Sequence, residues 1–315
     1  MNRTLTTRRP MSVARLARWI LAAGAASVLW STEAHGQLKV VTSTTDLADI
    51  ARAVGGDHVR ATHIGEGYED PHFVQPKPSF ILRLREADVW AYVGLDLEIG
   101  WMPLLLDGAR NQRITAGARG HINVSTVIPV LDANRAVDRS QGDVHPLGNP
   151  HYWLDPANAR RIAALFRDRF SELDPGHAAA YAANTSAFEA RLGAAEQGWA
   201  ADLATLKDKP IVAWHASWRY FAAYTGVRIV GFMEPKPGVP PSPAHLASLV
   251  ATMKATGARV ILMEPFYDRR TADKVARETG ARVLVVPPSV GGAKGLDDYI
   301  AVMRNAVATV AAAVR

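Results

Sequence analysis

The chain has 315 residues, of which 48% are hydrophobic and 21% are charged. This length suffices for one large domain or two of ordinary size, and the composition excludes a chain that is disordered throughout. The formal net charge of +6 falls to +2 when residues 1–36 are left out, because they hold five arginines and one glutamate. So small a charge gives no reason to expect a nucleic acid or an anionic membrane as a partner.

The first 36 residues have the features of a secretory signal. An arginine-rich start is followed by an apolar run over 19–30 and by small residues, with cleavage expected after Gly36 or after Ala34. The run has roughly half of the ~20 residues that a membrane-spanning helix needs, and an uncleaved anchor is the alternative. The sequence has no cysteine, which excludes disulfides, thiolate ligands and lipid attachment at a cysteine. We therefore expect an exported, periplasmic protein.

Short apolar runs then alternate with segments of helical periodicity along the whole chain. In the first half the pattern predicts strands over 38–41, 59–64, 89–93 and 122–124, and helices over 47–54, 78–86, 97–106 and 157–173. Residues 131–150 are rich in turn formers and are predicted to be a loop. In the second half it predicts strands over 211–214, 227–230, 260–263 and 283–286, and helices over 218–224, 243–256, 271–279 and 296–314. This alternation indicates an α/β fold of parallel sheets covered on both faces.

A single apolar stripe at helical spacing lies between the two halves. Its members are Tyr181, Phe188, Leu192, Ala195, Trp199, Leu203 and Leu206. A helix of about 30 residues would be about 45 Å long, which is too long for an ordinary crossover. We therefore predict two lobes, each a parallel sheet with flanking helices, joined by one long rigid helix. The alternative is two helices with a break near Gly193 or Gly198. The predicted divisions are a signal peptide over 1–36, lobes over 37–173 and 209–315, and a linking helix over 174–208.

Three histidines have unusual local settings. His72 lies beside a proline in GYEDPHFVQPKPS, and His151 lies in NPHYWLDP. His215 directly follows a predicted strand in IVAWHASW. In NPHYWLDP, Asp155 and Pro156 form a good helix start, so His151 would lie in a short stiff loop. Neutral imidazole is the commonest metal-binding side chain, so three such residues could form a preorganised site.

The order of the elements places these histidines at one edge. In open parallel sheets, ligands bind beyond the carboxyl ends of the strands. His215 occupies such an end, His72 follows the second strand, and His151 precedes a helix. We therefore predict a metal site in the cleft between the lobes. His35 belongs to the signal, and His145 is either a plain loop residue or one that passes metal to His151. The remaining histidines are interpreted as ordinary surface or core residues; they are His58, His63, His121, His177 and His245.

Five segments together resemble a known family. They are GYEDPHFVQPKPS, ADVWAYVGLDLE, NPHYWLDP, WHASWRYFAAYTG and VILMEPFYD. They look like the motifs of the periplasmic solute-binding proteins of zinc and manganese ABC importers, the cluster A-I or zinc-uptake A-like family. The resemblance extends over nearly all of the chain after the signal. It implies two α/β lobes joined by a long rigid helix, metal at the lobe interface, and His72, His151 and His215 as the first three ligands.

The fourth ligand departs from the family pattern. The family has Asp or Glu after the last strand of the second lobe, where this chain has Pro287-Pro288-Ser289. The fourth position would then be filled by water or by Glu264, which could equally be a structural acid. Glu234 and Asp70 are weaker candidates. Three imidazoles favour Zn²⁺, whereas Mn²⁺ prefers more oxygen, and affinity order alone would also admit Cu²⁺ or Ni²⁺.

The sequence therefore predicts a monomeric protein that binds a divalent metal ion, with zinc as the preferred metal, and delivers it to a membrane permease with its ATPase. The alternative is a zinc-dependent hydrolytic enzyme, because three histidines with an open fourth position also hold catalytic zinc. The sequence has no GxSxG nucleophile elbow and no HExxH motif, which favours transport over the enzyme.

Overall fold

The computed structural model describes residues 36–133, 145–236 and 238–315, and all structural statements concern these residues. Gln37–Arg315 form one unit by their contacts. The predicted signal peptide and most of the predicted loop after Ala133 lie outside the described residues. Among the described helices, none has the length and apolar character required to cross a membrane.

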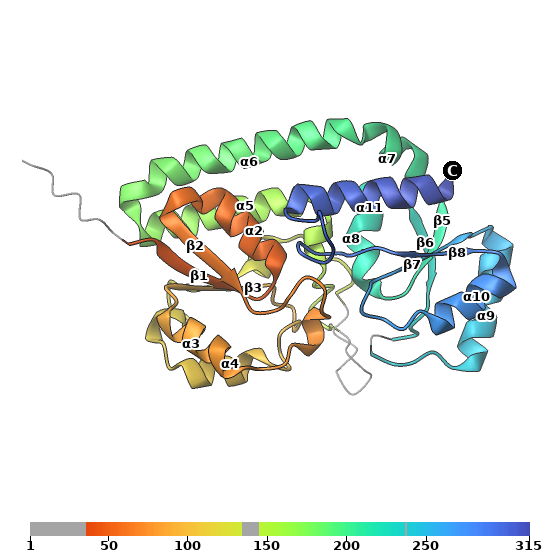
Figure 1. The fold of residues 1–315 in the computed structure, drawn as a ribbon, viewed down its shortest axis with the longest axis horizontal. Helices are drawn as coiled ribbons and strands as arrows, with labels where there is room; N and C mark the ends of the chain where they lie inside the picture. The colour runs from red at the N-terminus through yellow and green to blue at the C-terminus, as the bar shows by residue number, and fades with distance from the viewer. Residues whose placement is uncertain (1–35, 134–144, 237) are drawn as a thin grey trace, which may run out of the picture. The chain divides into compact units, whose positions relative to one another are not determined.

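The first lobe is a parallel four-stranded sheet in the order β2-β1-β3-β4 (Figure 1). Its elements are β1 (Leu38–Thr42), α2 (Thr45–Gly55), β2 (Val59–His63), α3 (Pro78–Glu86), β3 (Val89–Tyr92), α4 (Met102–Ala109), β4 (His121–Asn123) and α5 (Pro156–Leu173). The sequence analysis predicted each of these, and the bounds of α3 are correct to the residue. Asp155 accepts a hydrogen bond from the Ala157 amide at 2.8 Å and Pro156 opens α5, as the Asp-Pro pair predicted.

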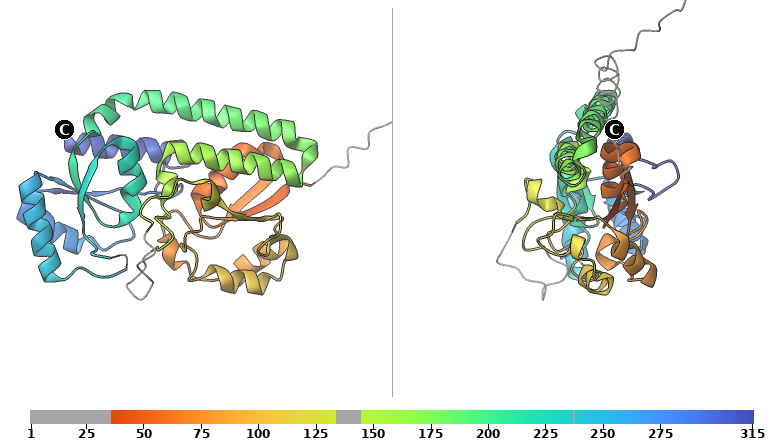
Figure 2. Two further views of the ribbon diagram at one scale, coloured as in Figure 1. Left: turned by 180° about the vertical axis from the view of Figure 1, so that it is seen from behind. Right: turned by 90° about the vertical axis from the view of Figure 1, so that its left-hand side faces the viewer.

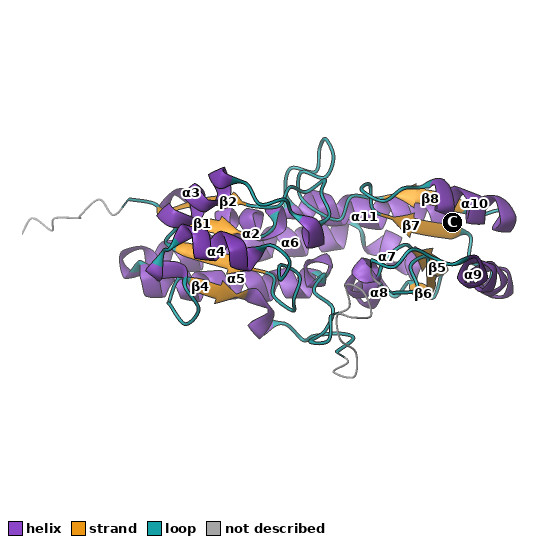
Figure 3. Ribbon diagram, turned by 90° about the horizontal axis from the view of Figure 1, so that it is seen from below, coloured by secondary structure: helices purple, strands orange, loops and turns teal. Residues whose placement is uncertain are grey.

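The second lobe repeats this topology with a parallel sheet in the order β6-β5-β7-β8. Its elements are β5 (Pro210–Ala213), α8 (Arg219–Thr225), β6 (Arg228–Phe232), α9 (Pro243–Thr256), β7 (Val260–Met263), α10 (Arg270–Thr279), β8 (Arg282–Val285) and α11 (Tyr299–Val314). Figure 3 shows the two sheets as separate groups of strands with helices around each. Two α/β lobes with parallel sheets are thus confirmed.

A long helix joins the lobes, as the apolar stripe predicted. α6 (Ala178–Gly198) extends from the first lobe towards the second, and α7 (Ala200–Leu206) follows it (Figure 2). The helix is interrupted at Trp199, which has φ −109° and ψ 13°. The Trp199 indole is buried and its Nε1 donates to the Tyr224 hydroxyl at 2.8 Å. The last turns of the stripe therefore belong to a separate short helix, which matches the alternative of a break near Gly198.

The two lobes share one buried core. Alternate residues of a strand point to opposite faces, so Val40 and Ile211 contribute to the shared core while Val41 and Val212 point to outer clusters. The outer cluster of the first lobe lies under α3 and α4, and that of the second under α9 and α10. The shared core includes side chains from α2, α5, α6 and α11. A swing of one lobe against the other would expose this core, so the residues at the seam are held firmly.

One helix starts later than the sequence predicted. The apolar pattern predicted a helix over 97–106, but α4 begins at Met102. Gly94, Leu95 and Asp96 have φ values of 80°, 55° and 66°. The buried Glu98 carboxylate accepts the amide hydrogens of Val93 and Gly94 at 2.7 and 3.0 Å and holds this turn. The chain leaves the left-handed region only after these residues, which delays the helix.

Candidate metal centre

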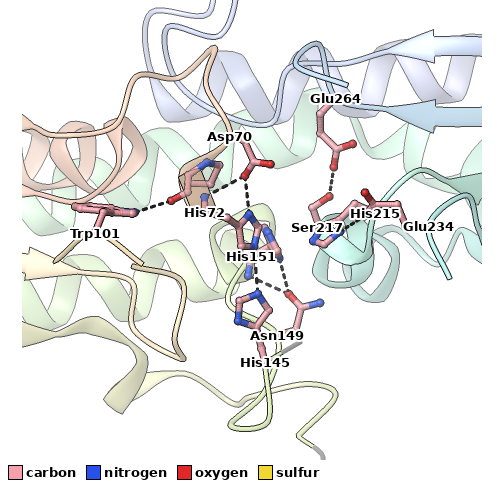
Figure 4. Close-up of polar contacts among 11 residues, drawn as sticks. Asp70, His72, Trp101, His145, Asn149, His151, His215, Ser217, Glu234 and Glu264 are labelled. Carbon is pink, nitrogen blue, oxygen red and sulfur yellow. Dashed lines mark hydrogen bonds and ion pairs between the residues drawn. The ribbon is translucent and has the colours of Figure 1, made fainter. Parts of the chain in front are cut away.

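Three histidines converge where the lobes meet. His72 lies in the 3₁₀ turn Pro71–Phe73 after β2, His151 directly precedes the 3₁₀ turn Tyr152–Leu154, and His215 follows β5. One nitrogen from each ring lies within 4.8 Å of the others. The ring centroids are 5.2 Å apart for His72 and His151, 5.4 Å for His72 and His215, and 5.1 Å for His151 and His215. The structure thus brings together the three residues that the sequence singled out (Figure 4).

Two of these rings are oriented by the same local motif. In Asp70-Pro71-His72, one carboxylate oxygen accepts both the backbone amide hydrogen and Nδ1–H of His72, at 3.0 and 2.6 Å. In Asn149-Pro150-His151, the amide oxygen does the same for His151, at 3.0 Å for both contacts. Asn149 Nδ2 donates to the Ala216 carbonyl at 2.8 Å, so its oxygen is the atom that faces His151. In both rings Nδ1 carries the hydrogen, and the lone pair is on Nε2.

The third ring is oriented by a residue from the neighbouring strand. His215 Nδ1 lies 2.9 Å from the Glu234 carboxylate, which follows β6. His215 Nε2 is buried and has no hydrogen-bond partner in the described structure. A buried polar atom without a partner costs free energy unless a ligand completes it. The Nδ1 contacts to fixed acceptors are typical of histidines that bind metal through Nε2.

The pKa shifts of His151 and Asp70 favour the binding of a cation. Burial lowers the pKa of His151 well below its usual value, and the neighbouring His215 and His72 lower it further. His151 is therefore neutral at pH 7 and can donate its lone pair. Burial alone would raise the pKa of Asp70, but its hydrogen bonds to His72 and its electrostatic interaction with that side chain outweigh burial, so its pKa is lowered. The Asp70 carboxylate thus stays ionised beside the rings.

The candidate oxygen ligands from the sequence have different roles in the structure. Asp70 and Glu234 both face the Nδ1 side of a ring rather than the Nε2 side. Glu264, at the end of β7, accepts a hydrogen bond from the Ser217 hydroxyl, and burial raises its pKa to about 8. Pro288 accepts a hydrogen bond from Trp153 Nε1 through its carbonyl at 3.0 Å. The other carboxylate oxygen of Glu264 is buried and has no hydrogen-bond partner in the described structure.

A small cavity of ≈ 10 Å³ lies against His72, His151, His215 and Glu264. This is about the room that one water molecule needs. A larger cavity of ≈ 460 Å³ lies elsewhere, along β1 and β2, and its lining includes four basic side chains, among them Arg52 and Arg60. It contains no group of three metal-ligating side chains among the residues that the structure describes. The histidine cluster is therefore the candidate site, despite its smaller volume.

A fourth histidine lies beside the cluster. His145 Nε2 is 3.1 Å from His72 Nε2, and the two ring centroids are 5.2 Å apart. His145 Nδ1 donates to the Leu95 carbonyl at 3.0 Å. The sequence analysis left two interpretations of His145 open, and the structure places its ring against that of His72.

The other described histidines lie outside the cluster. The ring of His58 stacks on that of His177 at 3.8 Å. His63, His121 and His245 make hydrogen bonds with local partners. His35 is outside the described residues. The interpretation of the five described ones as ordinary structural or surface residues agrees with these contacts.

Comparison with known proteins gives a consistent family assignment. The model of the ZnuA family, zinc-uptake complex component A, periplasmic, matches residues 40–313. The zinc-binding lipoprotein AdcA of Streptococcus pneumoniae is 27% identical over 281 residues, which are 87% of this chain and 55% of that protein. The manganese-binding lipoprotein MntA of Halalkalibacterium halodurans is 28% identical over 297 residues, 92% of this chain and 93% of MntA. The zinc uptake protein ZnuA of Brucella abortus is 33% identical over 156 residues, 49% of this chain and 47% of that protein. The chain thus spans about half the length of several of the curated relatives that it matches.

Solved structures agree on the fold. A crystal structure of ZnuA superimposes with a TM-score of 0.73 at 24% identity, covering 89% of this chain and all of that one. A manganese-bound periplasmic metal-binding protein from Candidatus Liberibacter asiaticus gives a TM-score of 0.72 at 20% identity, over 88% of this chain and 99% of the other. At these identities the likeness concerns the fold.

Proposed function

The chain belongs to the family of periplasmic zinc-uptake component A proteins, and on this premise we propose that it binds a divalent metal ion, zinc first, outside the cytoplasm and delivers it to an ABC importer. The observation that supports this most strongly is the orientation of three imidazole rings. His72, His151 and His215 each have Nδ1 against a fixed acceptor, and one nitrogen of each ring lies within 4.8 Å of the others. Such a set is ordered before the metal arrives, so little ordering entropy is lost on binding.

The donor atoms favour zinc over manganese. Zn²⁺ takes nitrogen ligands in a tetrahedron, whereas Mn²⁺ is better suited to carboxylate and water oxygens. The two ionisable side chains closest to the rings, Asp70 and Glu234, contact Nδ1 atoms and leave the Nε2 side to nitrogen. Their carboxylates can still balance the charge of a dication. Relatives named for zinc and for manganese both occur among the matches, so the preference for zinc is argued from the donor atoms and not from family membership.

The remaining parts of the proposal concern the whole protein. Residues 1–36 would be a signal peptide that directs export, followed by lobes over 37–173 and 209–315 and a linking segment over 174–208. The protein would act as a monomer in the periplasm and present metal to a permease that is driven by its ATPase. The two cavities beside the rings, of ≈ 10 and ≈ 40 Å³, are small for an organic substrate, which supports metal transport rather than hydrolysis.

The test is metal content and affinity of the purified protein. We expect about one zinc per chain by elemental analysis, with the ion lost when His72, His151 and His215 are all replaced by alanine. A matched control replaces His58, His63 and His245, which lie outside the cluster. Zinc binding as tight in the first variant as in the wild type would refute the assignment of the ligands. Metal-dependent turnover of ester substrates, abolished by a chelator, would instead support the enzymatic alternative.

A further inference from the structure

We propose that His145 is the fourth ligand of the metal, so that the ion is bound by four imidazoles. This inference rests on the proposed function, because it concerns the same ion. Three of the rings, those of His72, His145 and His151, come from the first lobe, and His215 comes from the second. The proposal fills the position that lacks the carboxylate of the family pattern.

The first observation is a contact between two nitrogen atoms. His72 Nδ1 donates to the Asp70 carboxylate, and His145 Nδ1 donates to the Leu95 carbonyl, since a carbonyl oxygen can only accept. When a ring with Nδ1 engaged in this way is neutral, its lone pair is on Nε2. These two Nε2 atoms face each other at 3.1 Å. Two lone pairs at this distance repel unless a proton or a metal ion lies between them, and in the proposed site the metal ion takes this place.

One nitrogen–nitrogen distance agrees with tetrahedral coordination. Zn–N bonds of about 2.0–2.1 Å in a tetrahedron place the ligand nitrogens about 3.3 Å apart. The separation between His72 Nε2 and His145 Nε2, 3.1 Å, is close to this value. The His145 ring is 6.2 Å from the His151 ring, wider than the 5.1–5.4 Å among the other three, so His145 must move inward to complete the site. Figure 4 shows it pointing at these rings from the loop that precedes Asn149.

The second observation is the turn that holds His145. The Leu95 carbonyl belongs to three successive residues in the left-handed region, Gly94, Leu95 and Asp96. This conformation is unfavourable for a bulky residue such as leucine, and it persists only where the surroundings enforce it. The Glu98 carboxylate enforces it by accepting the amide hydrogens of Val93 and Gly94. A strained turn that orients a histidine towards three others is expected at a binding site rather than in an ordinary loop.

Two of the three candidate carboxylates are less suited to the fourth position. Asp70 and Glu234 are engaged by the Nδ1 atoms of His72 and His215. Glu264 accepts a hydrogen bond from Ser217 on one carboxylate oxygen, while its other oxygen is buried without a partner in the described structure, so Glu264 is the competing oxygen ligand. The proposed site has four nitrogens, and such a donor set selects Zn²⁺ or Co²⁺ strongly over Mn²⁺.

The experiment counts the imidazole ligands directly. X-ray absorption spectroscopy on the zinc-loaded protein reports the number of bound imidazoles, and the visible spectrum of the cobalt-loaded protein reports the geometry independently. The variants are His145→Ala, the matched histidine control His58→Ala, and Glu264→Gln as the test of the competing oxygen ligand. Circular dichroism and one bound metal per chain show that each variant is folded and loaded.

We expect four imidazoles in the wild type and in both other variants, and three in His145→Ala. We also expect zinc affinity to fall by about tenfold or more in His145→Ala and to stay unchanged in His58→Ala. Three imidazoles in the wild type, with the same spectrum in His145→Ala, would overturn the inference and leave the proposed function intact. An oxygen ligand lost only in Glu264→Gln would overturn it in favour of Glu264. A wild type that binds no zinc would overturn both the inference and the proposed function.

Discussion

The contact between Asp70 and His72 predicts how much one oriented ring contributes to metal affinity. The two variants that separate its charge from its geometry are Asp70→Asn and Asp70→Ala. Asn149 already holds His151 through an amide oxygen in the equivalent position. Asp70→Asn can therefore keep both hydrogen bonds and remove only the negative charge, whereas Asp70→Ala removes the acceptor as well.

The size of the effect follows from the two bonds that the carboxylate accepts, at 3.0 and 2.6 Å. A hydrogen bond to a charged group contributes about 1.5–3 kcal/mol, and loss of the partner of a metal-binding histidine costs about 10–100-fold in affinity. We expect zinc affinity to fall about tenfold in Asp70→Asn and about 100-fold in Asp70→Ala, the latter equal to about 2.7 kcal/mol. The difference between the variants measures the value of geometry without charge.

The assay is competition for zinc against a chelating dye at pH 7.5, with thermal melts of the metal-free proteins to show that each is folded. The control is Asp268→Ala, because Asp268 is an acid that pairs with Arg270 at the surface, outside the cluster. If Asp70→Ala binds zinc with wild-type affinity, orientation of His72 by this carboxylate does not contribute to binding. Equal losses in the two Asp70 variants would assign the whole contribution to charge.

Three further results are expected. Zinc affinity should fall as the pH drops below about 6.5, because imidazole binds metal only when deprotonated, and titrations at pH 7.5 and 5.5 test this. In the metal-free protein the raised pKa of Glu264 gives stability that is full below pH 4.5 and is lost by about pH 8. Glu264→Gln should remove this slope of up to about 1.4 kcal/mol per pH unit, measured by denaturant unfolding between pH 5 and 7.5. Asn149→Asp should lower the free energy of unfolding by about 1–3 kcal/mol, which a lower melting temperature would show. The reason is that the variant places a carboxylate oxygen against the Ala216 carbonyl, to which Asn149 Nδ2 donates at 2.8 Å in the wild type.

The elements were predictable because their local signals agree with the packing. Pro78–Glu86 and Pro243–Thr256 begin at a proline and continue with helical periodicity, and both are predicted to the residue. Val260–Met263 is an apolar run, and it is buried throughout as a central strand. Where tertiary contacts override the local pattern, prediction failed. The left-handed turn held by Glu98 delays α4, and the buried Trp199 interrupts the linking helix.

The site was only partly predictable, and the reason is sequence separation. The three rings were recognised because each follows a strand or stands beside a proline. The repeated Asx-Pro-His pattern around His72 and His151 was visible and could have identified Asp70 as an orienting residue rather than a candidate ligand. Glu234 lies 19 residues from His215, and His145 lies 73 residues from His72, so neither contact leaves a local signal. Those contacts depend on the way the strands and the loop fold back on one another.

The contacts across the seam also indicate which ligands can move when metal is released. His151 is fixed from both lobes, because Asn149 bonds to Ala216 and the neighbouring Trp153 bonds to the Pro288 carbonyl. Displacing it would disturb the shared core, which includes Trp153. His72 and His145 lie next to exposed side chains, Phe73 at 58% and Leu147 at 50% exposure. The His72 segment is nevertheless held, because Trp101 Nε1 donates to the Pro71 carbonyl at 3.1 Å and Val74 is buried. On the proposed function, we therefore expect release to begin on the side of His145, while His151 keeps its position.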